Sequence, residues 1–359
     1  MQALTRNDSS SDANYSTQYW AQLPFDYHPA KYMFFARVKL PGEWAEGEIR
    51  PLEDLLLSPA AAVLNYGQAA FEGMKALRTP QGKVVLFRPF DNARRFQRSA
   101  SRLVMPPYPV DRFVAAVEAV VRANADYIPP YISARELHRQ PSLYIRPVMI
   151  GSGPVLGVKP ASEYTFYIIV SPVGPFLPGN GWLMVPDAAH RATPFGTGDI
   201  KAAANYAGTL LPQKLKPEGY KDVLYLDARS NENIEELSSS NFFAVLKDGT
   251  LITPKLGSIL PGITRDSVIR IARELLEMRV EERDILIDEV LTSTAEAFFT
   301  GTAAVIQPIT KIAYRGTTHT IGPSDEQMGK TTQELSNCLV EIQTQQQADP
   351  FGWVREVSI

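Results

Sequence analysis

The chain has 359 residues, of which 45% are hydrophobic, and a formal net charge of -3 from 36 basic and 39 acidic residues. This length supports a large core and roughly two domains, whereas the balanced charge without a basic run excludes the pattern of a nucleic-acid-binding protein. The single cysteine, Cys338, excludes an internal disulfide framework and a cysteine-rich metal site, and the four histidines lack ligand spacing, so no metal is expected.

The N-terminal residues 1–18 are polar and lack both the apolar core of a signal peptide and the arginine-rich pattern of a transit peptide. No apolar run in the chain is long enough to cross a bilayer. We therefore expect a disordered polar head over residues 1–18. Together with the single cysteine, this indicates a soluble protein of the cytoplasm without a membrane partner.

The first part of the chain combines short strands with an amphipathic helix. Residues 76–89 predict a hairpin that turns at Pro80 to Gly82, and the apolar run 164–170 predicts a buried strand. Residues 110–125 predict a helix that Asp111 caps. Its core face carries Phe113, Val117, Val120 and Val121.

The stretch 171–186 is dense in proline and glycine and predicts a linker between domains. We expect an α+β architecture with a small N-terminal domain over residues 19–173 and an interdomain loop over residues 174–186. A large C-terminal domain then covers residues 187–359. The cleft between two such domains is a common place for a binding site.

Lys201 lies among small residues, after Ile200 and before three alanines. Most lysines are solvated surface charges, and the pattern permits that interpretation. Burial among small apolar groups would also favour the neutral amine that a Schiff base with a carbonyl cofactor requires. Small neighbours leave room for a flat ring, and Tyr206 offers a phenol to an oxygen of that ring.

The C-terminal part contains two segments suited to an anion. Residues 242–254 predict a hairpin that turns at Asp248-Gly249, and residues 264–278 predict a helix. The core face of this helix carries Val268, Ile271, Ala272, Leu275 and Leu276. The helix start at Gly262 to Thr264 and the turn at Gly301-Thr302 present N–H groups that suit a phosphate or carboxylate. Each segment is equally compatible with a simple helix cap or a tight turn.

Six motifs in order over most of the chain resemble the branched-chain amino acid aminotransferases, which are pyridoxal-phosphate enzymes of fold type IV. They are LNYGQAAFEGMKALR, LFRPFDNARRFQRSASRL, SLYIRPVMIG, DIKAAANYAGTLLPQ, EELSSSNFF and LPGITR. The resemblance runs from about Pro51 to the C-terminal ADPFGW. It implies the two-domain fold of that family, with the cofactor in the cleft.

The resemblance implies a role for each matching residue around pyridoxal 5'-phosphate. Lys201 would form the Schiff base and shuttle the proton, and Glu236 would keep the pyridine nitrogen protonated. Tyr206 would contact the phenolic oxygen of the ring, and Asn241 would hold the surroundings of Glu236. The implied phosphate donors are Arg95, Ile263, Thr264 and Thr302.

The resemblance also implies transamination of leucine, isoleucine and valine with 2-oxoglutarate, which gives branched-chain 2-oxo acids and L-glutamate. Tyr144 and Arg146 would receive the γ-carboxylate of glutamate. Leu156 and Val158 would reach over the pocket from another subunit, so a homodimer or higher homo-oligomer is implied. The remaining substrate-binding residues are Tyr66, Phe71, Ser239 and Ala303.

The sequence departs from the family pattern at a few positions. Ala304 and Gln307 stand where redox-regulated members have a Cys-x-x-Cys pair, and Phe176 stands where the family has a tyrosine. The alternatives are a fold type IV relative that acts on D-amino acids, amines or a specialised-pathway amino acid, a carbon–carbon lyase, and a scaffold without catalysis. The YIRP and FEGMKA signatures favour the branched-chain enzyme over the other fold type IV activities, and the pair of Lys201 and Glu236 argues against the scaffold.

Overall fold

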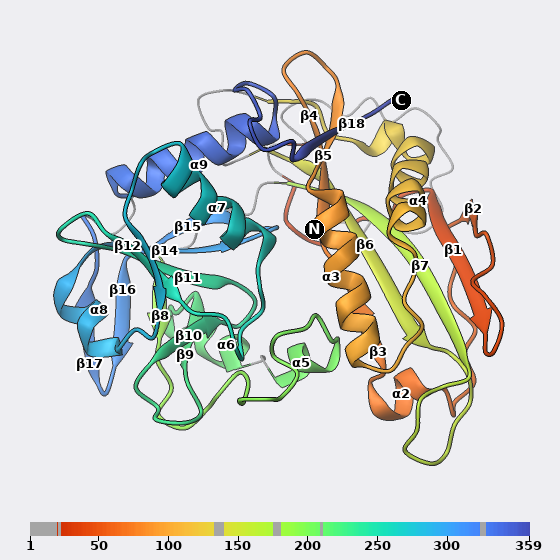
Figure 1. The fold of residues 1–359 in the computed structure, drawn as a ribbon, viewed down its shortest axis with the longest axis horizontal. Helices are drawn as coiled ribbons and strands as arrows, with labels where there is room; N and C mark the ends of the chain where they lie inside the picture. Colours follow the sequence, from red (N-terminus) through yellow and green to blue (C-terminus); the bar gives the residue numbers. More distant parts are fainter. Residues whose placement is uncertain (1–19, 21–22, 133–139, 175–180, 209–210, 324–327) are drawn as a thin grey trace.

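The computed structural model describes residues 20, 23–132, 140–174, 181–208, 211–323 and 328–359. The expected head and Phe176 lie outside these residues. Two sheets with their helices lie side by side, and helices α3 and α5 occupy the region where the two halves meet (Figure 1). Within the described part of the chain, no helix is long and apolar enough to cross a membrane.

The first sheet is antiparallel, in the order β18-β5-β4-β6-β7-β1-β2, with β3 paired to β6. Its strands are β1 (Tyr32–Lys39), β2 (Glu48–Pro51), β3 (Ala69–Phe71), β4 (Met74–Arg78), β5 (Val84–Phe87), β6 (Ser142–Gly151), β7 (Glu163–Val173) and β18 (Val354–Val357). The associated helices are α2 (Ala62–Tyr66), α3 (Pro89–Arg102) and α4 (Val110–Ala123), followed by the short η1 (Ala125–Tyr127).

The predicted elements of this half form with one correction. The β4–β5 hairpin and the buried strand β7 are confirmed. Helix α4 is also confirmed, and Phe113 from α4 packs on Phe96 from α3 and on Phe166 from β7. Asp111 does not cap α4, because the helix begins at Val110 and the N-cap position belongs to Pro109, which has no side-chain acceptor.

The second sheet is mixed, in the order β13-β12-β11-β10-β9-β8-β16-β17, with β14 paired to β11 and β15. Its strands are β8 (Trp182–Met184), β9 (Asp222–Leu226), β10 (Ile234–Leu237), β11 (Asn241–Leu246), β12 (Leu251–Pro254), β13 (Val280–Arg283), β14 (Thr294–Gly301), β15 (Val305–Ile309), β16 (Lys311–Tyr314) and β17 (Thr317–Thr320). The helices are α5 (Ala204–Ala207), α6 (Leu211–Leu215), the short η4 (Lys216–Glu218), α7 (Ile263–Glu274), α8 (Ile287–Ser293) and α9 (Lys330–Gln343).

The predicted β11–β12 hairpin is confirmed, with Gly249 at a φ of 88° in its turn. Helix α7 starts at Ile263 as expected but ends at Glu274, so Leu275 and Leu276 do not continue its face. The helix ends there because the chain turns at Glu277, whose φ is 52°, and the Met278 N–H returns to the Ala272 carbonyl. Both leucines nevertheless pack against the same apolar cluster as α7.

Two segments differ from the expected division into domains, namely the expected linker and the C-terminal segment. Residues 182–184 of the expected linker form β8 in the second sheet, while residues 175–180 lie outside the described part. At the other end, β18 pairs with β5 of the first sheet, and Trp353 packs into the cluster around α7 and α9. The domain boundaries stay a prediction, and the chain end contributes to both halves.

Candidate active site

The segment of Lys201 lies against the first sheet and helix α3. The Lys201 carbonyl accepts from the Phe71 N–H at 3.1 Å, and Ala202 bridges to Ala70 on β3. The Lys201 N–H donates to Ser99 Oγ on α3 at 3.0 Å. These backbone contacts fix the start of the Lys201 side chain between the two halves of the molecule.

The Lys201 amine faces aromatic groups. Its Nζ donates to the Tyr206 hydroxyl at 3.0 Å and lies 4.5 Å from the centre of the Phe71 ring. The Phe71 and Tyr206 rings meet edge to face at 4.9 Å. The half-buried amine is therefore directed by a phenol and a ring face.

Glu236 on β10 is buried, with 2% of its surface exposed. Its Oε1 contacts Arg191 Nη1 at 2.7 Å and accepts from the Leu260 N–H at 3.1 Å, while Oε2 accepts from Asn241 Nδ2 at 3.1 Å. Burial raises the pKa of Glu236 to about 7, although Arg191, the Leu260 N–H and Lys201 each favour the ionised form.

The neighbouring Glu235 has other surroundings. Its side chain accepts from the Ser258 hydroxyl, and burial also raises its pKa. Successive side chains of a strand point to opposite faces, so the two carboxylates are directed away from each other. The Lys201 charge acts on Glu236, which favours Glu236 over Glu235 as the acid of this site.

Three of the predicted phosphate donors line one small cavity. Ile263 and Thr264 open helix α7, and Thr302 follows β14, where its hydroxyl donates to the Gly73 carbonyl at 3.2 Å. The N–H groups of a first helical turn lack partners within the helix and carry the positive end of its dipole. The cavity therefore suits an anion.

Arg95 is buried and forms a bidentate ion pair with Glu72. Its Nε and Nη2 contact the two carboxylate oxygens at 2.7 and 2.8 Å, and Nη1 donates to the Pro261 carbonyl at 3.2 Å. These contacts use three of the five guanidinium N–H groups. Arg94 is not a substitute, because its side chain is 64% exposed and pairs with Asp91.

Sequence reasoning missed two basic residues of this region. Lys75 lines the same cavity, donates from Nζ to the Ala303 carbonyl at 3.0 Å, and has its pKa lowered to about 8 by burial. Arg191 has only 1% of its side chain exposed and contacts Glu236. The apolar neighbours of Lys75 in strand β4 were the one available signal, and no pattern marks Arg191.

The substrate-binding candidates fall into two groups. Arg146 and Tyr144 on β6 lie together, with Arg146 Nη2 donating to the Tyr144 hydroxyl at 3.2 Å and the guanidinium 5.0 Å from the Phe71 ring. Ala303 accepts from Lys75, and Ser239 lies in the turn beside Gly301. These residues border the Lys201 region.

The second group lies at the surface. The Tyr66 hydroxyl donates to the Leu156 carbonyl within the same chain. Leu156 and Val158 are 92% and 90% exposed. The single chain therefore does not fold these two side chains over its own Lys201.

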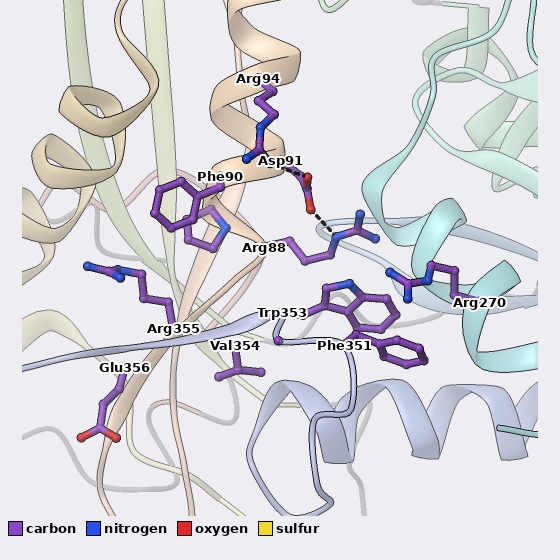
Figure 2. Close-up of a pocket in the computed structure, with 12 residues that line it drawn as sticks. Arg88, Phe90, Asp91, Arg94, Arg270, Phe351, Trp353, Val354, Arg355 and Glu356 are labelled. Carbon is purple, nitrogen blue, oxygen red and sulfur yellow. Dashed lines mark hydrogen bonds and ion pairs between the residues drawn. The ribbon is translucent and has the colours of Figure 1, made fainter. Parts of the chain in front are cut away.

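A separate groove lies over the start of α3 and the C-terminal segment, and four arginines line it (Figure 2). Each arginine already has an acidic partner. Arg88 pairs with Asp91 and Asp266, Arg94 pairs with Asp91, Arg270 pairs with Glu274, and Arg355 pairs with Glu118. The groove therefore offers an anion little uncommitted charge, and the Lys201 region remains the candidate.

The sequence is similar to known aminotransferases over most of its length. The family model described as amino-transferase class IV matches residues 69–312. The chain is 43% identical to a branched-chain-amino-acid aminotransferase of Helicobacter pylori over 94% of this chain and 97% of the relative. It is 39% identical to a methionine aminotransferase of Arabidopsis thaliana over 97% of this chain and 96% of the relative.

The fold is also similar to solved structures of branched-chain amino acid aminotransferases. A branched-chain amino acid aminotransferase from Escherichia coli matches with a TM-score of 0.74 and 28% identity, over 92% of this chain and 100% of that chain. Another from Thermobaculum terrenum, solved in its PLP-form, matches with a TM-score of 0.73 and 26% identity. That match covers 92% of this chain and 99% of the neighbour.

Proposed function

The chain belongs to the branched-chain-amino-acid aminotransferases of the class IV family, and on this premise we propose that it transfers amino groups from leucine, isoleucine and valine to 2-oxoglutarate, with pyridoxal 5'-phosphate as cofactor. The products are the branched-chain 2-oxo acids and L-glutamate. The expected enzyme class and fold type IV are confirmed. The observation that supports the proposed chemistry best is the series of contacts that connects the Lys201 amine, through Tyr206 and Arg191, to the buried Glu236.

The described residues fit the cofactor. Glu236 offers a buried carboxylate on which three donors use three of about four acceptor positions, so one position remains for a ring N–H. The cavity at the start of α7 offers N–H and hydroxyl donors for a phosphate. Gly73 lines this cavity, and a Cβ there would lie 2.2 Å from the Tyr144 hydroxyl, so a larger residue at this position would clash with Tyr144.

Pyridoxal 5'-phosphate supplies a carbonyl that condenses with amines and a ring that withdraws electrons from the α-carbon of the substrate. The Lys201 amine would hold the cofactor through its carbonyl carbon until the amine of the amino-acid substrate takes its place there. The freed Nζ would then accept the proton from the substrate α-carbon and donate it to the C4' carbon of the cofactor. Glu236 would accept a hydrogen bond from the ring nitrogen and keep it protonated, and Asn241 holds Glu236 in place. Tyr206 would donate to the ring oxygen, and the phosphate would be bound by Ile263, Thr264, Thr302 and Arg95.

The substrate pocket combines aromatic walls with one charged end. Phe71 and Tyr144 present ring surface to an aliphatic side chain, and Arg146 beside Tyr144 binds the γ-carboxylate of glutamate. Tyr66, Ser239 and Ala303 complete the pocket. A methionine donor is the second candidate, because a methionine aminotransferase is 39% identical over nearly the whole chain.

The proposed active unit is a homodimer or higher homo-oligomer in a reducing compartment such as the cytoplasm. The support for self-association is the pair of highly exposed apolar side chains at Leu156 and Val158, which a second copy would cover. The support for the compartment is the single, buried cysteine.

The test measures initial rates with leucine, isoleucine, valine, methionine and aspartate as donors and 2-oxoglutarate as acceptor. We expect high kcat/KM for the three branched-chain donors, and a preference for methionine would establish the second candidate. Lys201→Ala should bind the cofactor noncovalently, lose the visible absorbance of the lysine-bound form, and lose nearly all turnover. Turnover of Lys201→Ala close to that of the parent would refute the role of this lysine.

A further inference from the structure

Arg191 follows β8 in the chain and precedes Lys201, and its side chain is almost completely buried. Arginine is seldom buried to this extent unless it is paired. Its Nη1 contacts Glu236 Oε1 at 2.7 Å, which makes the two side chains a buried ion pair.

The remaining contacts of Arg191 reach other parts of the same site. Its Nε donates to the Ser238 carbonyl at 3.3 Å, and Nη1 lies 3.5 Å from the Gly198 carbonyl. The guanidinium carbon lies 5.7 Å from the centre of the Tyr206 ring. One side chain therefore contacts the strand end beyond Glu236, the loop that precedes Lys201, and the phenol that accepts from the Lys201 amine.

The charges around Glu236 come from several elements. Arg191 and Lys201 favour the carboxylate, whereas Glu235 on the same strand disfavours it. Arg265 on α7 also interacts with Glu236 but pairs with Glu282. Arg191 is thus the direct ionic partner of Glu236, and a buried carboxylate that loses such a partner becomes protonated.

We propose that Arg191 is a positioning residue that holds Glu236 ionised and in place, and that it connects this carboxylate to the loop that carries Lys201. The inference rests on the proposed function, in which Glu236 binds the ring nitrogen of the cofactor. The contact with Arg191 leaves one hydrogen-bond acceptor position of the Glu236 carboxylate free for the ring nitrogen. It also keeps Glu236 negatively charged, so that this position can accept a hydrogen bond.

The experiment uses pyridoxamine 5'-phosphate, which binds without a covalent bond to lysine. Its affinity for the apoprotein is measured from pH 5.5 to 9 for the parent, Arg191→Gln, Arg191→Lys and Arg102→Gln. Arg102 is the matched control, because it donates to the Phe195 and Gly196 carbonyls of the same loop but has no contact with Glu236. Circular dichroism and thermal unfolding establish that each variant is folded.

In the parent we expect affinity to fall as Glu236 becomes protonated at low pH. Arg191→Gln should move the midpoint of this loss upward by about one unit or more, because a neighbouring opposite charge typically shifts a carboxyl pKa by one to three units. Arg191→Lys should restore most of the parent profile, and Arg102→Gln should retain it. A folded Arg191→Gln variant with the parent midpoint would overturn the proposal.

Glu236→Gln and the double variant with Arg191→Gln separate the possible failures. If Glu236→Gln has the parent profile, the role of Glu236 is wrong and the proposal for Arg191 fails with it. If Glu236→Gln abolishes the pH dependence, Arg191→Gln should have little further effect in that background. If Arg191→Gln does not fold, recovery of folding in the double variant supports the coupling, and continued failure overturns it.

Discussion

Glu235 and Glu236 are identical and adjacent in sequence, yet their hydrogen-bond partners differ completely. Ser258 contacts the first, whereas Arg191, Asn241 and the Leu260 N–H surround the second. All of these partners come from other segments of the chain. Because their surroundings differ, the Lys201 charge acts on Glu236 rather than on Glu235.

The raised pKa of Glu236 predicts a pH-dependent stability of the apoprotein. Between the unfolded pKa near 4.3 and the folded value of about 7, only the folded state holds the proton, so stability falls as pH rises through this window. Glutamine does not titrate, so Glu236→Gln should not lose this stability. The free energy of unfolding of Glu236→Gln minus that of the parent should therefore increase by up to about 3 kcal/mol from pH 4.5 to pH 7.5. Thermal unfolding of both apoproteins at the two pH values measures this, and a difference independent of pH would contradict it.

At the residue scale, the sequence allows site residues to be predicted where a local motif marks them. Lys201 and Glu236 belong to such motifs, and the structure brings both to one region. Arg191 and Lys75 were missed because their importance depends on distant partners. Lys75 on β4 contacts the turn after β14 through the Ala303 carbonyl, and the sequence of a strand does not contain the information that this turn lies against it.

At the scale of elements, the start of α7 links the acid to the anion cavity. Asn241 at the start of β11 donates to Glu236 and also to the Leu260 carbonyl at 2.9 Å, just before the helix. Gly262 then passes close to Asn241, and its missing side chain permits this approach. The Asn241 amide therefore holds both the Glu236 carboxylate and the segment that leads into α7.

Gly262→Ala tests this link. The new Cβ would lie 2.0 Å from Asn241 Oδ1, so the amide must shift, which would disturb its hydrogen bond to Glu236. We expect cofactor affinity to fall about tenfold, which corresponds to about 1–2 kcal/mol for a lost hydrogen bond to a buried group. Gly257→Ala is the control, since its Cβ would meet no atom within 4 Å. Equal affinities for the two variants would argue against the link.

Elements with local signals were predictable, and their ends were not. The two hairpins form at the turns that Gly82 and Gly249 permit, because turn residues and alternating burial act over a few positions. The failures at Asp111 and Leu275 concern helix ends. There the chain direction depends on packing of neighbouring segments rather than on the helix periodicity.

At the scale of the whole molecule, the C-terminal segment joins the two halves. Trp353 stacks on Phe351 at 4.0 Å and packs on Phe87 from β5, while its carbonyl accepts from the Arg88 N–H at 2.8 Å. The same tryptophan belongs to the cluster that includes α7 and α9. It therefore contributes to packing in both halves.

Trp353→Ala should lower the free energy of unfolding by about 3–5 kcal/mol, because a large buried aromatic side chain is lost from a junction. Ile359→Ala should have little effect, since that side chain is largely exposed. Urea unfolding of both variants measures the difference. A Trp353→Ala variant as stable as the parent would show that the junction does not depend on this ring.

Self-association is the second prediction at this scale. Leu156→Glu combined with Val158→Glu should shift the molar mass in solution toward the single chain and reduce turnover, because charges there would oppose coverage by a second copy. Leu286→Glu, at another exposed leucine before α8, should leave the mass unchanged. Light scattering after gel filtration measures the mass. An unchanged assembly in the double variant would place the interface elsewhere.

The pairing of β18 with β5 also has a consequence for protein synthesis. On the ribosome, β5 emerges early, whereas β18 follows every other described strand and helix. Until then, the edge of β5 that β18 will cover exposes its backbone N–H and carbonyl groups, which is the kind of surface that pairs with other nascent chains. A chaperone that shields strand edges should therefore act on this chain from the emergence of β5 until β18 has emerged and paired.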